Sequence, residues 1–197
     1  MVGDGTPPEE LRSTFEDIVQ AGVRAADVIE RVMGLVRKEP RPPRPVDLNH
    51  LVQEVARVVH SELVLHQVRL VLTLDATLPS VLGDPVQLQQ VILNVLLNGA
   101  DAMADSPLAE RELAVTTASL RTQAQVSVCD RGKGVGATEL PRIFEPFFST
   151  KPNGTGMGLS ISSEIIRAHG GRIWAENGAS GGMILRFVLP AAQSPAD

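Results

Sequence analysis

Residues 85–103 read PVQLQQVILNVLLNGADAM and determine how the rest of this chain is interpreted. A proline directly after Asp84, followed by good helix formers, predicts a helix that ends near Met103. Its polar side chains recur three or four residues apart and so share one face; they are Gln87, Gln90, Asn94, Asn98 and Asp101. Buried amides need partners, and a carboxamide oxygen can bind Mg²⁺ beside phosphate oxygens. The face is either a solvated surface or a polar binding surface.

The sequence on both sides of this helix predicts an α+β domain. A helix capped by Asp47 carries Leu51, Val55, Val58 and Val59 on one face. Alternation of apolar residues predicts strands at 68–75, 113–118, 124–130, 172–176 and 183–189. A further helix at 158–168 is ended by the glycines at 170–171. His169, at the end of that helix, is expected to be a cation stabilised by the helix dipole.

A separate segment precedes this domain. Residues 9–38 place apolar or small residues alternately four and three positions apart, a heptad pattern that favours pairing with another helix. A helix that lies on the globular body is the alternative. Prolines at 40, 42, 43 and 45 end this helix. We expect an N-terminal helix over 1–39, a linker over 40–46, the main domain over 47–190 and a tail over 191–197.

Composition excludes several classes of protein. The 197 residues carry a formal net charge of -5, with five Phe, one Trp and no Tyr, which argues against a nucleic-acid surface. The single cysteine, Cys129, cannot form an internal disulfide. No apolar run reaches the roughly 18 to 20 residues that cross a bilayer. We therefore expect a cytoplasmic chain with no transmembrane segment and no nucleic-acid partner.

Two glycine-rich segments are candidate ligand sites. The sequence DRGKG at 130–134 follows a predicted strand, where Asp130 can accept a hydrogen bond from an exocyclic amine and the glycines allow close approach of a flat ring. A plain turn is the alternative. The sequence GTGMGL at 154–159 opens a predicted helix, whose N-terminal amides and dipole can bind phosphate. Lys151 lies close enough in sequence to reach a terminal phosphate.

These segments occur in a set order, with FEPFFSTK at 144–151 between the last two. In this order they resemble the catalytic ATP-binding domain of sensor histidine kinases, the Bergerat ATP-binding fold, over about residues 46–190. The sequences at 144–151 and 154–161 are most similar to the oxygen-sensor and nitrogen-regulatory branch. The resemblance implies a two-layer α/β sandwich, ATP and Mg²⁺ as cofactors, and ATP-dependent protein-histidine kinase activity in two-component signal transduction. Residues 9–38 resemble the second helix of the dimerisation and phosphoacceptor hairpin.

The resemblance also implies roles for individual residues. Asn98, together with Asn94, would lie at the phosphates, with Asn98 as the Mg²⁺ ligand, and Asp130 would bind the adenine amino group. Residues 144–151 would belong to the ATP lid. Asp101 stands where the family often has another nucleotide-contacting residue, although an acid would repel phosphates unless it faces the ribose or the metal. The implied ATP-binding set is Asn94, Asn98, Asp101, Asp130, Gly132, Gly134, Phe144, Phe147, Lys151, Gly154, Thr155, Gly156, Met157, Gly158 and Leu159.

The acceptor motif of these kinases is missing from the sequence. In the family, the acceptor histidine is followed by an acidic residue and, a few positions on, a proline; none of His50, His60, His66 and His169 has this context. We therefore expect transfer of the ATP γ-phosphoryl group to a histidine of another segment or chain, without autophosphorylation. The expected partners are that histidine-bearing dimerisation helix, a response-regulator receiver domain and, weakly, a second copy through residues 9–38.

Two other functions stay open on the sequence. One is a nucleotide-dependent interaction module without catalysis, because an intact ATP site binds nucleotide whether or not an acceptor exists. The other is a self-sufficient ATPase of the same fold. Such ATPases carry a glutamate base one turn before the metal-binding asparagine, where this chain has Asn94, with Gln90 a turn earlier. An amide cannot take up a proton as a base, so the ATPase is the less favoured reading.

Overall fold

The computed structural model describes residues 42–151, 154–179 and 181–192, so the expected helix at 9–38 and the last five residues lie outside the described residues. The elements follow in chain order. They are β1 (Arg44–Val46), α2 (Leu48–Val58), α3 (His60–Leu65), β2 (Arg69–Thr73), β3 (Val81–Gly83), α4 (Pro85–Ala102), η1 (Leu108–Glu110), β4 (Glu112–Leu120), β5 (Gln123–Cys129), η2 (Leu140–Arg142), α5 (Gly158–Ala168), β6 (Arg172–Asn177) and β7 (Met183–Pro190).

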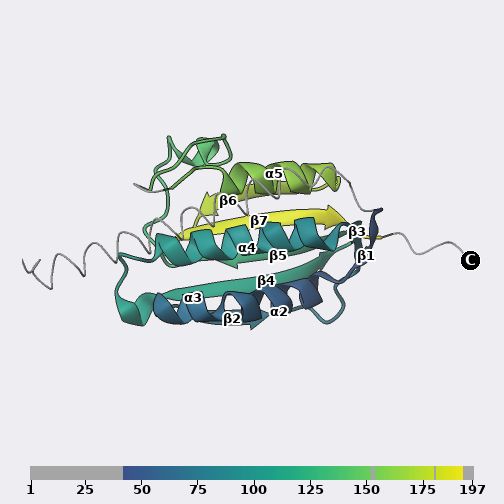
Figure 1. Ribbon diagram of the computed structural model, residues 1–197, viewed down its shortest axis with the longest axis horizontal. Helices are drawn as coiled ribbons and strands as arrows, with labels where there is room; N and C mark the ends of the chain where they lie inside the picture. The colour runs from purple at the N-terminus through teal and green to yellow at the C-terminus, as the bar shows by residue number, and fades with distance from the viewer. Residues whose placement is uncertain (1–41, 152–153, 180, 193–197) are drawn as a thin grey trace, which may run out of the picture. The chain divides into compact units, whose positions relative to one another are not determined.

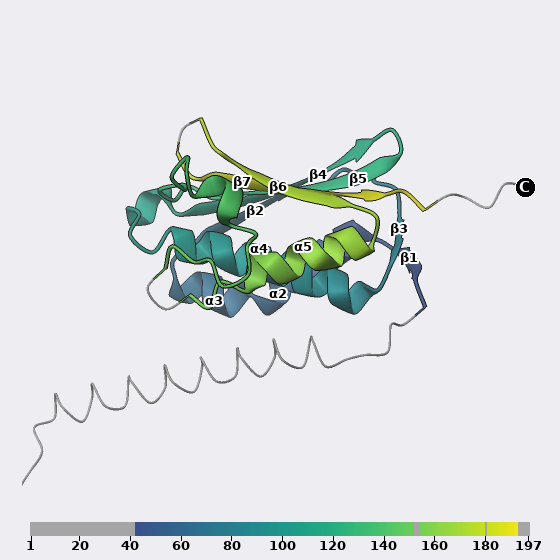
Figure 2. The same ribbon diagram turned by 90° about the horizontal axis from the view of Figure 1, so that it is seen from above.

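Five strands form the main sheet in the order β2-β4-β5-β7-β6 (Figure 1). Strand β2 runs parallel to β4, and all other neighbours are antiparallel. The helices α2, α4 and α5 all cover one face of this sheet, as Figure 2 shows, with α4 between the other two. This is the α+β, two-layer sandwich that the sequence predicted. Among the described residues, no helix is long and apolar enough to cross a membrane.

The core lies between the sheet and the helices because successive strand residues point to opposite faces. Alternate apolar residues of β4, β5 and β7 are buried; these are Leu113, Val115, Ala124, Val126, Val128, Leu185, Phe187 and Leu189. From α4 the buried set is Leu88, Val91, Ile92, Val95, Leu96 and Ala100. Burying each large apolar side chain contributes about 1.5–3 kcal/mol, so α4 is held on the sheet by its apolar face.

Local signals set both ends of α4 and α5. The Asp84 carboxylate accepts the Val86 N–H at 2.8 Å and caps α4, with Pro85 at its first position. Helix α5 has the bounds that the sequence predicted. Gly170 follows α5 with a φ of 71°, and the Gly171 N–H bonds to the Ile166 carbonyl at 2.9 Å, which is a glycine C-cap.

The expectation that His169 is a helix-terminal cation is wrong. Its Nε2 accepts the backbone N–H of Asp84 at 3.0 Å, and its Nδ1 lies 2.8 Å from the Ile165 carbonyl oxygen. A nitrogen that accepts a hydrogen bond carries no proton, so the ring is neutral, with its proton on Nδ1. The neutral imidazole ties the end of α5 to the start of α4.

Short elements and one helix face differ from the sequence prediction. The sequence predicts Val58 on the buried face of α2, but it is 74% exposed, while the next residue, Val59, is buried. The helix α3 and the strand pair β1–β3 were not predicted. Residues 44–46, expected at the end of a linker, form β1 against β3. Pro45 is tolerated there because β1 is an edge strand.

Arg111 joins three segments at the end of α4. Its guanidinium donates to the carbonyls of His66 at 2.8 Å, Ala104 at 2.7 Å and Ser106 at 3.0 Å. A guanidinium presents five N–H donors in one plane, which suits three acceptors at once. The turn after α4 and the loop before β2 are thereby fixed to the start of β4.

We expect Arg111→Ala to lower the free energy of unfolding by about 1–2 kcal/mol, since three carbonyls lose a charged donor. Urea unfolding checks this as a lower midpoint with an unchanged slope. The control is Arg57→Ala on α2, where an exposed 3.4 Å contact to the Gln53 carbonyl is lost and little change is expected. Equal midpoints for Arg111→Ala and the wild type would contradict the proposed role of Arg111.

Candidate functional site

The polar face of α4 meets the start of α5. Asn94 Nδ2 donates to the Gly158 carbonyl at 3.2 Å and lies 3.5 Å from Ser162 Oγ, which is fully buried. A Cβ built on Gly158 would be in ordinary contact with Asn98 Nδ2 at 3.5 Å. Asn94 and Asn98 are both partly buried rather than solvated. The structure therefore brings the asparagine face and the glycine-rich segment together, and Asn94 is the side chain that joins the two helices.

Asp130 lies directly after β5 and is almost fully buried, with 3% of its surface exposed. Its Oδ1 accepts the backbone N–H groups of Gly132 at 2.8 Å and of Met183 at 3.2 Å. Within the described residues Oδ2 accepts no hydrogen bond. Gly99 brings α4 next to this carboxylate, because an added Cβ at Gly99 would stand 3.7 Å from Asp130 Cβ. No buried side-chain oxygen of the described residues lacks a hydrogen-bond partner, so the free Oδ2 of this buried residue reaches solvent, beside the turn of α4 that carries Asn98.

Burial raises the pKa of Asp130, because a carboxylate loses hydration in the interior. The hydrogen bonds from Gly132 and Met183 and the positive charge of Lys151 oppose this rise in pKa. A buried carboxylate with one oxygen unused is costly for folding alone. Such a group is typical of a functional site, where a ligand donor completes its hydrogen bonding.

The turn after Asp130 is shaped for close approach. At Gly132 an added Cβ would stand 2.5 Å from the Ala102 carbonyl oxygen, so only glycine fits against the end of α4. The following residues are held by Asn177, which donates to the Val135 carbonyl at 2.7 Å and accepts the Val135 N–H at 3.0 Å. Gly134, beside Asn177, has a φ of 70°. Asn177 was not predicted as a site residue, because the sequence around an asparagine at the end of a strand does not indicate a hydrogen-bond partner 42 residues away.

The two expected lid phenylalanines occupy different environments. Phe144 is partly buried and packs on the hydrophobic core, whereas Phe147 is 78% exposed. Phe147 has a φ of 64°, uncommon for a bulky residue, and its N–H bonds to the Gly156 carbonyl at 3.1 Å. Gly156 has a φ of 66°, and an added Cβ would stand 2.4 Å from the Phe147 carbonyl carbon. Within the described residues, neither phenylalanine has a recorded contact with Asn98 or Asp130.

Lys151 does reach the asparagine face. Its Nζ lies 2.9 Å from Asp101 Oδ2, 3.3 Å from Asn98 Oδ1 and 3.5 Å from the Asn98 carbonyl oxygen. Lysine, aspartate and asparagine side chains from two distant segments therefore form one cluster. A phosphate bound with a metal ion here would lie near the Lys151 ammonium and the Asn98 carboxamide oxygen.

The glycine-rich segment forms the start of α5. Met157 is the N-cap residue of α5 and makes no side-chain capping hydrogen bond. Ser160 Oγ donates to the Met157 carbonyl at 2.9 Å, while Leu159 packs on the core. Gly154 donates its N–H to the Lys151 carbonyl at 3.2 Å, and Thr155 lies between Gly154 and Gly156. Gly158, the first residue of α5, is the part of this segment that lies next to Asn94 and Asn98.

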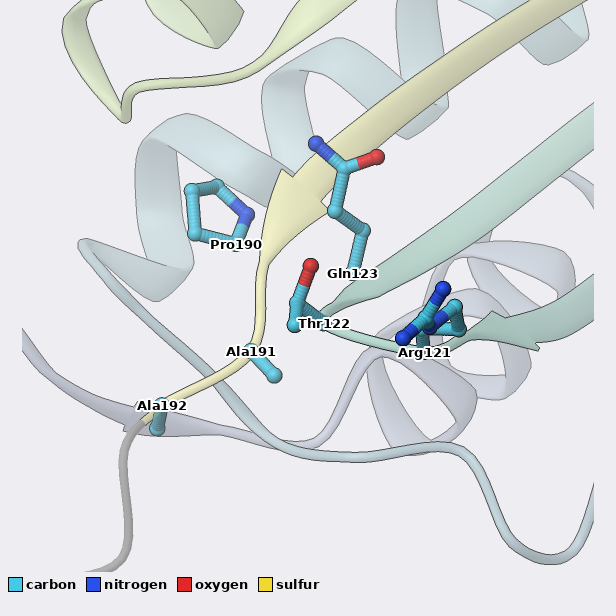
Figure 3. Close-up of a pocket in the computed structure, with 6 residues that line it drawn as sticks. All are labelled: Arg121, Thr122, Gln123, Pro190, Ala191 and Ala192. Atoms are coloured by element: carbon cyan, nitrogen blue, oxygen red, sulfur yellow. The ribbon is translucent and has the colours of Figure 1, made fainter.

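One surface hollow lies away from this site (Figure 3). It is lined by Arg121, Thr122, Gln123, Pro190, Ala191 and Ala192. Gln123 begins β5 and Asp130 follows its end, so the hollow and the carboxylate lie at opposite ends of that strand. None of the ATP-binding residues expected from the sequence lines this hollow.

Comparison with known proteins agrees with the geometry. Residues 83–193 match the family of histidine kinase-, DNA gyrase B-, and HSP90-like ATPases, and the chain belongs to this family. It carries the catalytic ATP-binding domain of a sensor histidine kinase. It is 39% identical over 184 residues to the sensor protein FixL of Bradyrhizobium diazoefficiens. The aligned region covers 93% of this chain and 36% of FixL.

A second relative and a solved structure give the same picture. The sensory histidine kinase/phosphatase NtrB of Rhizobium leguminosarum bv. phaseoli is 34% identical over 188 residues, covering 85% of this chain and 48% of NtrB. The chain thus spans less than half the length of both relatives. The catalytic domain of the histidine kinase ThkA superposes with a TM-score of 0.69 at 30% identity, covering 77% of this chain and 97% of that domain.

The raised pKa of Asp130 leads to a prediction about stability. Asp130→Asn keeps an Oδ1 acceptor for Gly132 and Met183 but removes the buried charge. The ionised form is disfavoured in the folded state, so the wild type loses stability as pH rises through the folded pKa. We expect the stability of Asp130→Asn relative to the wild type to increase from about pH 4 to pH 7, measured by urea unfolding.

Asp75→Asn is a matched control of opposite sign. Hydrogen bonds from the Thr77 hydroxyl, the Thr77 N–H and the Ser119 N–H lower the pKa of Asp75. Its carboxylate therefore adds stability above the unfolded pKa and loses it at acid pH. Asp75→Asn should therefore become less stable relative to the wild type as pH rises, mainly below about pH 5, so its unfolding curves are extended to about pH 3. Parallel curves for the two variants would refute the assignment of a costly buried charge to Asp130.

Proposed function

We propose that this domain binds ATP with Mg²⁺ and donates the γ-phosphoryl group to a histidine supplied by another segment or chain. The observation that carries the proposal is the unused Oδ2 of the buried Asp130, set beside a turn where only glycine fits. The exocyclic amine of adenine is a donor that would complete the hydrogen bonding of this carboxylate. A guanine carbonyl at the same place would meet an acceptor, so the site favours adenine.

The residues at the other end of the site fit a metal-bound triphosphate. Bound Mg²⁺ would link phosphate oxygens and neutralise their charge, with Asn98 Oδ1 as its protein ligand. Lys151 adds a second cation within 3.3 Å of that oxygen. The amides at the start of α5 supply further donors for phosphate. Positioning and charge neutralisation are the main contributions that phosphoryl transfer requires of a protein.

The nucleophile has to come from outside this domain. Attack by an imidazole nitrogen on the γ-phosphorus breaks the bond to the β-γ bridging oxygen and leaves ADP, and any base that helps belongs to the acceptor helix. Asn94, which stands where an ATPase needs a base, is an amide that already donates to Gly158. This observation favours transfer to a histidine over hydrolysis by a self-sufficient ATPase.

The partners follow from this activity as part of the proposal. A phosphohistidine formed on a dimerisation helix would be read by a response-regulator receiver domain, the class of partner with which the relative ThkA has been solved. The segment at 9–38 would contribute to weak self-association. ATP is a cytoplasmic substrate, so we place the domain in the cytoplasm.

Calorimetric titration with ATP tests the nucleotide site. We expect binding that is tighter with Mg²⁺, loss of the Mg²⁺ effect in Asn98→Ala, and at least a tenfold weaker affinity in Asp130→Asn, about 1.4 kcal/mol. The last effect arises because an amide N–H₂ would face the adenine amine. Gln89→Ala is the control, since this α4 side chain bonds to Glu54 of α2 at 2.9 Å. Unchanged affinity in Asp130→Asn would refute the adenine assignment.

A transfer assay separates the kinase from a non-catalytic module. The domain is mixed with Mg²⁺, radiolabelled ATP and a separate histidine-bearing dimerisation hairpin from a related kinase. We expect acid-labile label on the hairpin and none on this chain. Tight ATP binding without label on any hairpin tested would favour the interaction module, and steady phosphate release without a hairpin would favour an ATPase.

A further inference from the structure

Asp101 is the residue of this site whose presence the proposed function leaves unexplained. It lies one turn after Asn98 on the same face of α4, and about half of its side chain is exposed. A carboxylate next to bound phosphates repels them. The structure pairs it with Lys151 at 2.9 Å, so the charge of Asp101 is neutralised by a residue that reaches it from 50 positions along the chain.

The ammonium of Lys151 uses its three donors unequally. The contact to Asp101 has the usual length of a charged hydrogen bond. The contacts to Asn98, at 3.3 Å and 3.5 Å, are long and weak. A phosphate oxygen is a stronger acceptor than either, so the ammonium can exchange both contacts for phosphate and keep its bond to Asp101. The carboxylate thus acts as a fixed point for the lysine.

Without a charged partner, the side chain of Lys151 would not be held at the site. Its four-carbon stem is flexible and its ammonium is strongly hydrated, so an unpaired lysine spends its time in water. Here the side chain of Lys151 is only 35% exposed, although it comes from an exposed segment. Asp101 is the carboxylate that forms an ion pair with this ammonium within the described residues, whereas Asp130 interacts with the charge of Lys151 without a recorded hydrogen bond to it.

We propose that Asp101 is a positioning residue, which holds Lys151 beside Asn98 so that the ammonium meets the terminal phosphate of bound ATP. The proposal rests on the proposed function, because it requires ATP in this site. Asp101 itself does not contact the nucleotide. Its effect on ATP binding therefore depends on Lys151, and the sign of that effect changes when Lys151 loses its charge.

Calorimetry on a double-mutant cycle tests this dependence, with Mg²⁺ and ATP as the probe. Asp101→Asn alone should weaken ATP binding about threefold, the scale of a partly exposed ion pair. Lys151→Met should weaken it further, because a cation is lost and Asp101 is left uncompensated. In the Lys151→Met background, Asp101→Asn should instead strengthen binding about threefold by removing an unpaired negative charge.

The other outcomes of the cycle refute the proposal. A weakening by Asp101→Asn in both backgrounds would mean that Asp101 contacts the nucleotide or supports the fold without Lys151. A strengthening in both backgrounds would mean simple repulsion of phosphate. Either result is compatible with ATP binding by the wild type and so leaves the proposed function standing. A wild type that binds no ATP would overturn the proposed function as well.

A measurement without nucleotide tests the ion pair itself. An amine-reactive ester is added to the free protein, and labelling of Lys151 is followed by peptide mass spectrometry, with the exposed Lys133 as the internal reference. We expect Asp101→Asn to raise the labelling of Lys151 about twofold relative to Lys133, as the ammonium is released from the carboxylate. An unchanged ratio would show that Asp101 does not hold Lys151 in solution, and the proposal would fall.

Discussion

Helix α4 lies so close to the sheet that an added Cβ at Gly99 would stand 2.5 Å from Leu113 Cδ1. This close packing is what the rest of the structure depends on. It buries the apolar face of α4 on β4 and β5, and it brings the residue before Gly99, the ligand candidate Asn98, to the level of Asp130 at the end of β5. A side chain at position 99 would have to displace the end of Leu113 within the core, directly beside Asp130.

The electrostatics of the site follow from the same packing. Asp130 is buried because α4 and the turn after β5 close over it, and two backbone N–H groups offset part of the cost. At the outer edge of α4, Asp101 and Lys151 stay partly exposed, where an ion pair is worth little for stability. The candidate site therefore has a largely buried end at Asp130, suited to a nucleobase, and a more exposed, charged end at Asp101 and Lys151, suited to phosphates.

Sequence patterns predicted the features that local chemistry determines. The caps at Asp47 and Asp84, the bounds of α5 and the shared face of Asn94 and Asn98 all follow from side chains within a few residues. The features that were missed depend on residues far apart in the chain. Asn177 bonds to the backbone of Val135, and the neutral His169 accepts a hydrogen bond from the Asp84 N–H. Neither interaction can be predicted from the residues next to it in the sequence. The short strands β1 and β3 were not predicted, because three residues are too few to show an alternation of apolar and polar side chains.

The bond between His169 and Asp84 joins residues 85 positions apart and connects the end of α5 to the start of α4. The segment between β5 and α5, which includes Phe147 and Lys151, begins and ends at elements of the packed sheet and helices. Its length can therefore change during evolution at small thermodynamic cost, since each doubling of a loop adds only about 0.6 kcal/mol of closure entropy. A longer or shorter version of that segment can therefore be accommodated without changing how α4 and α5 pack on the sheet.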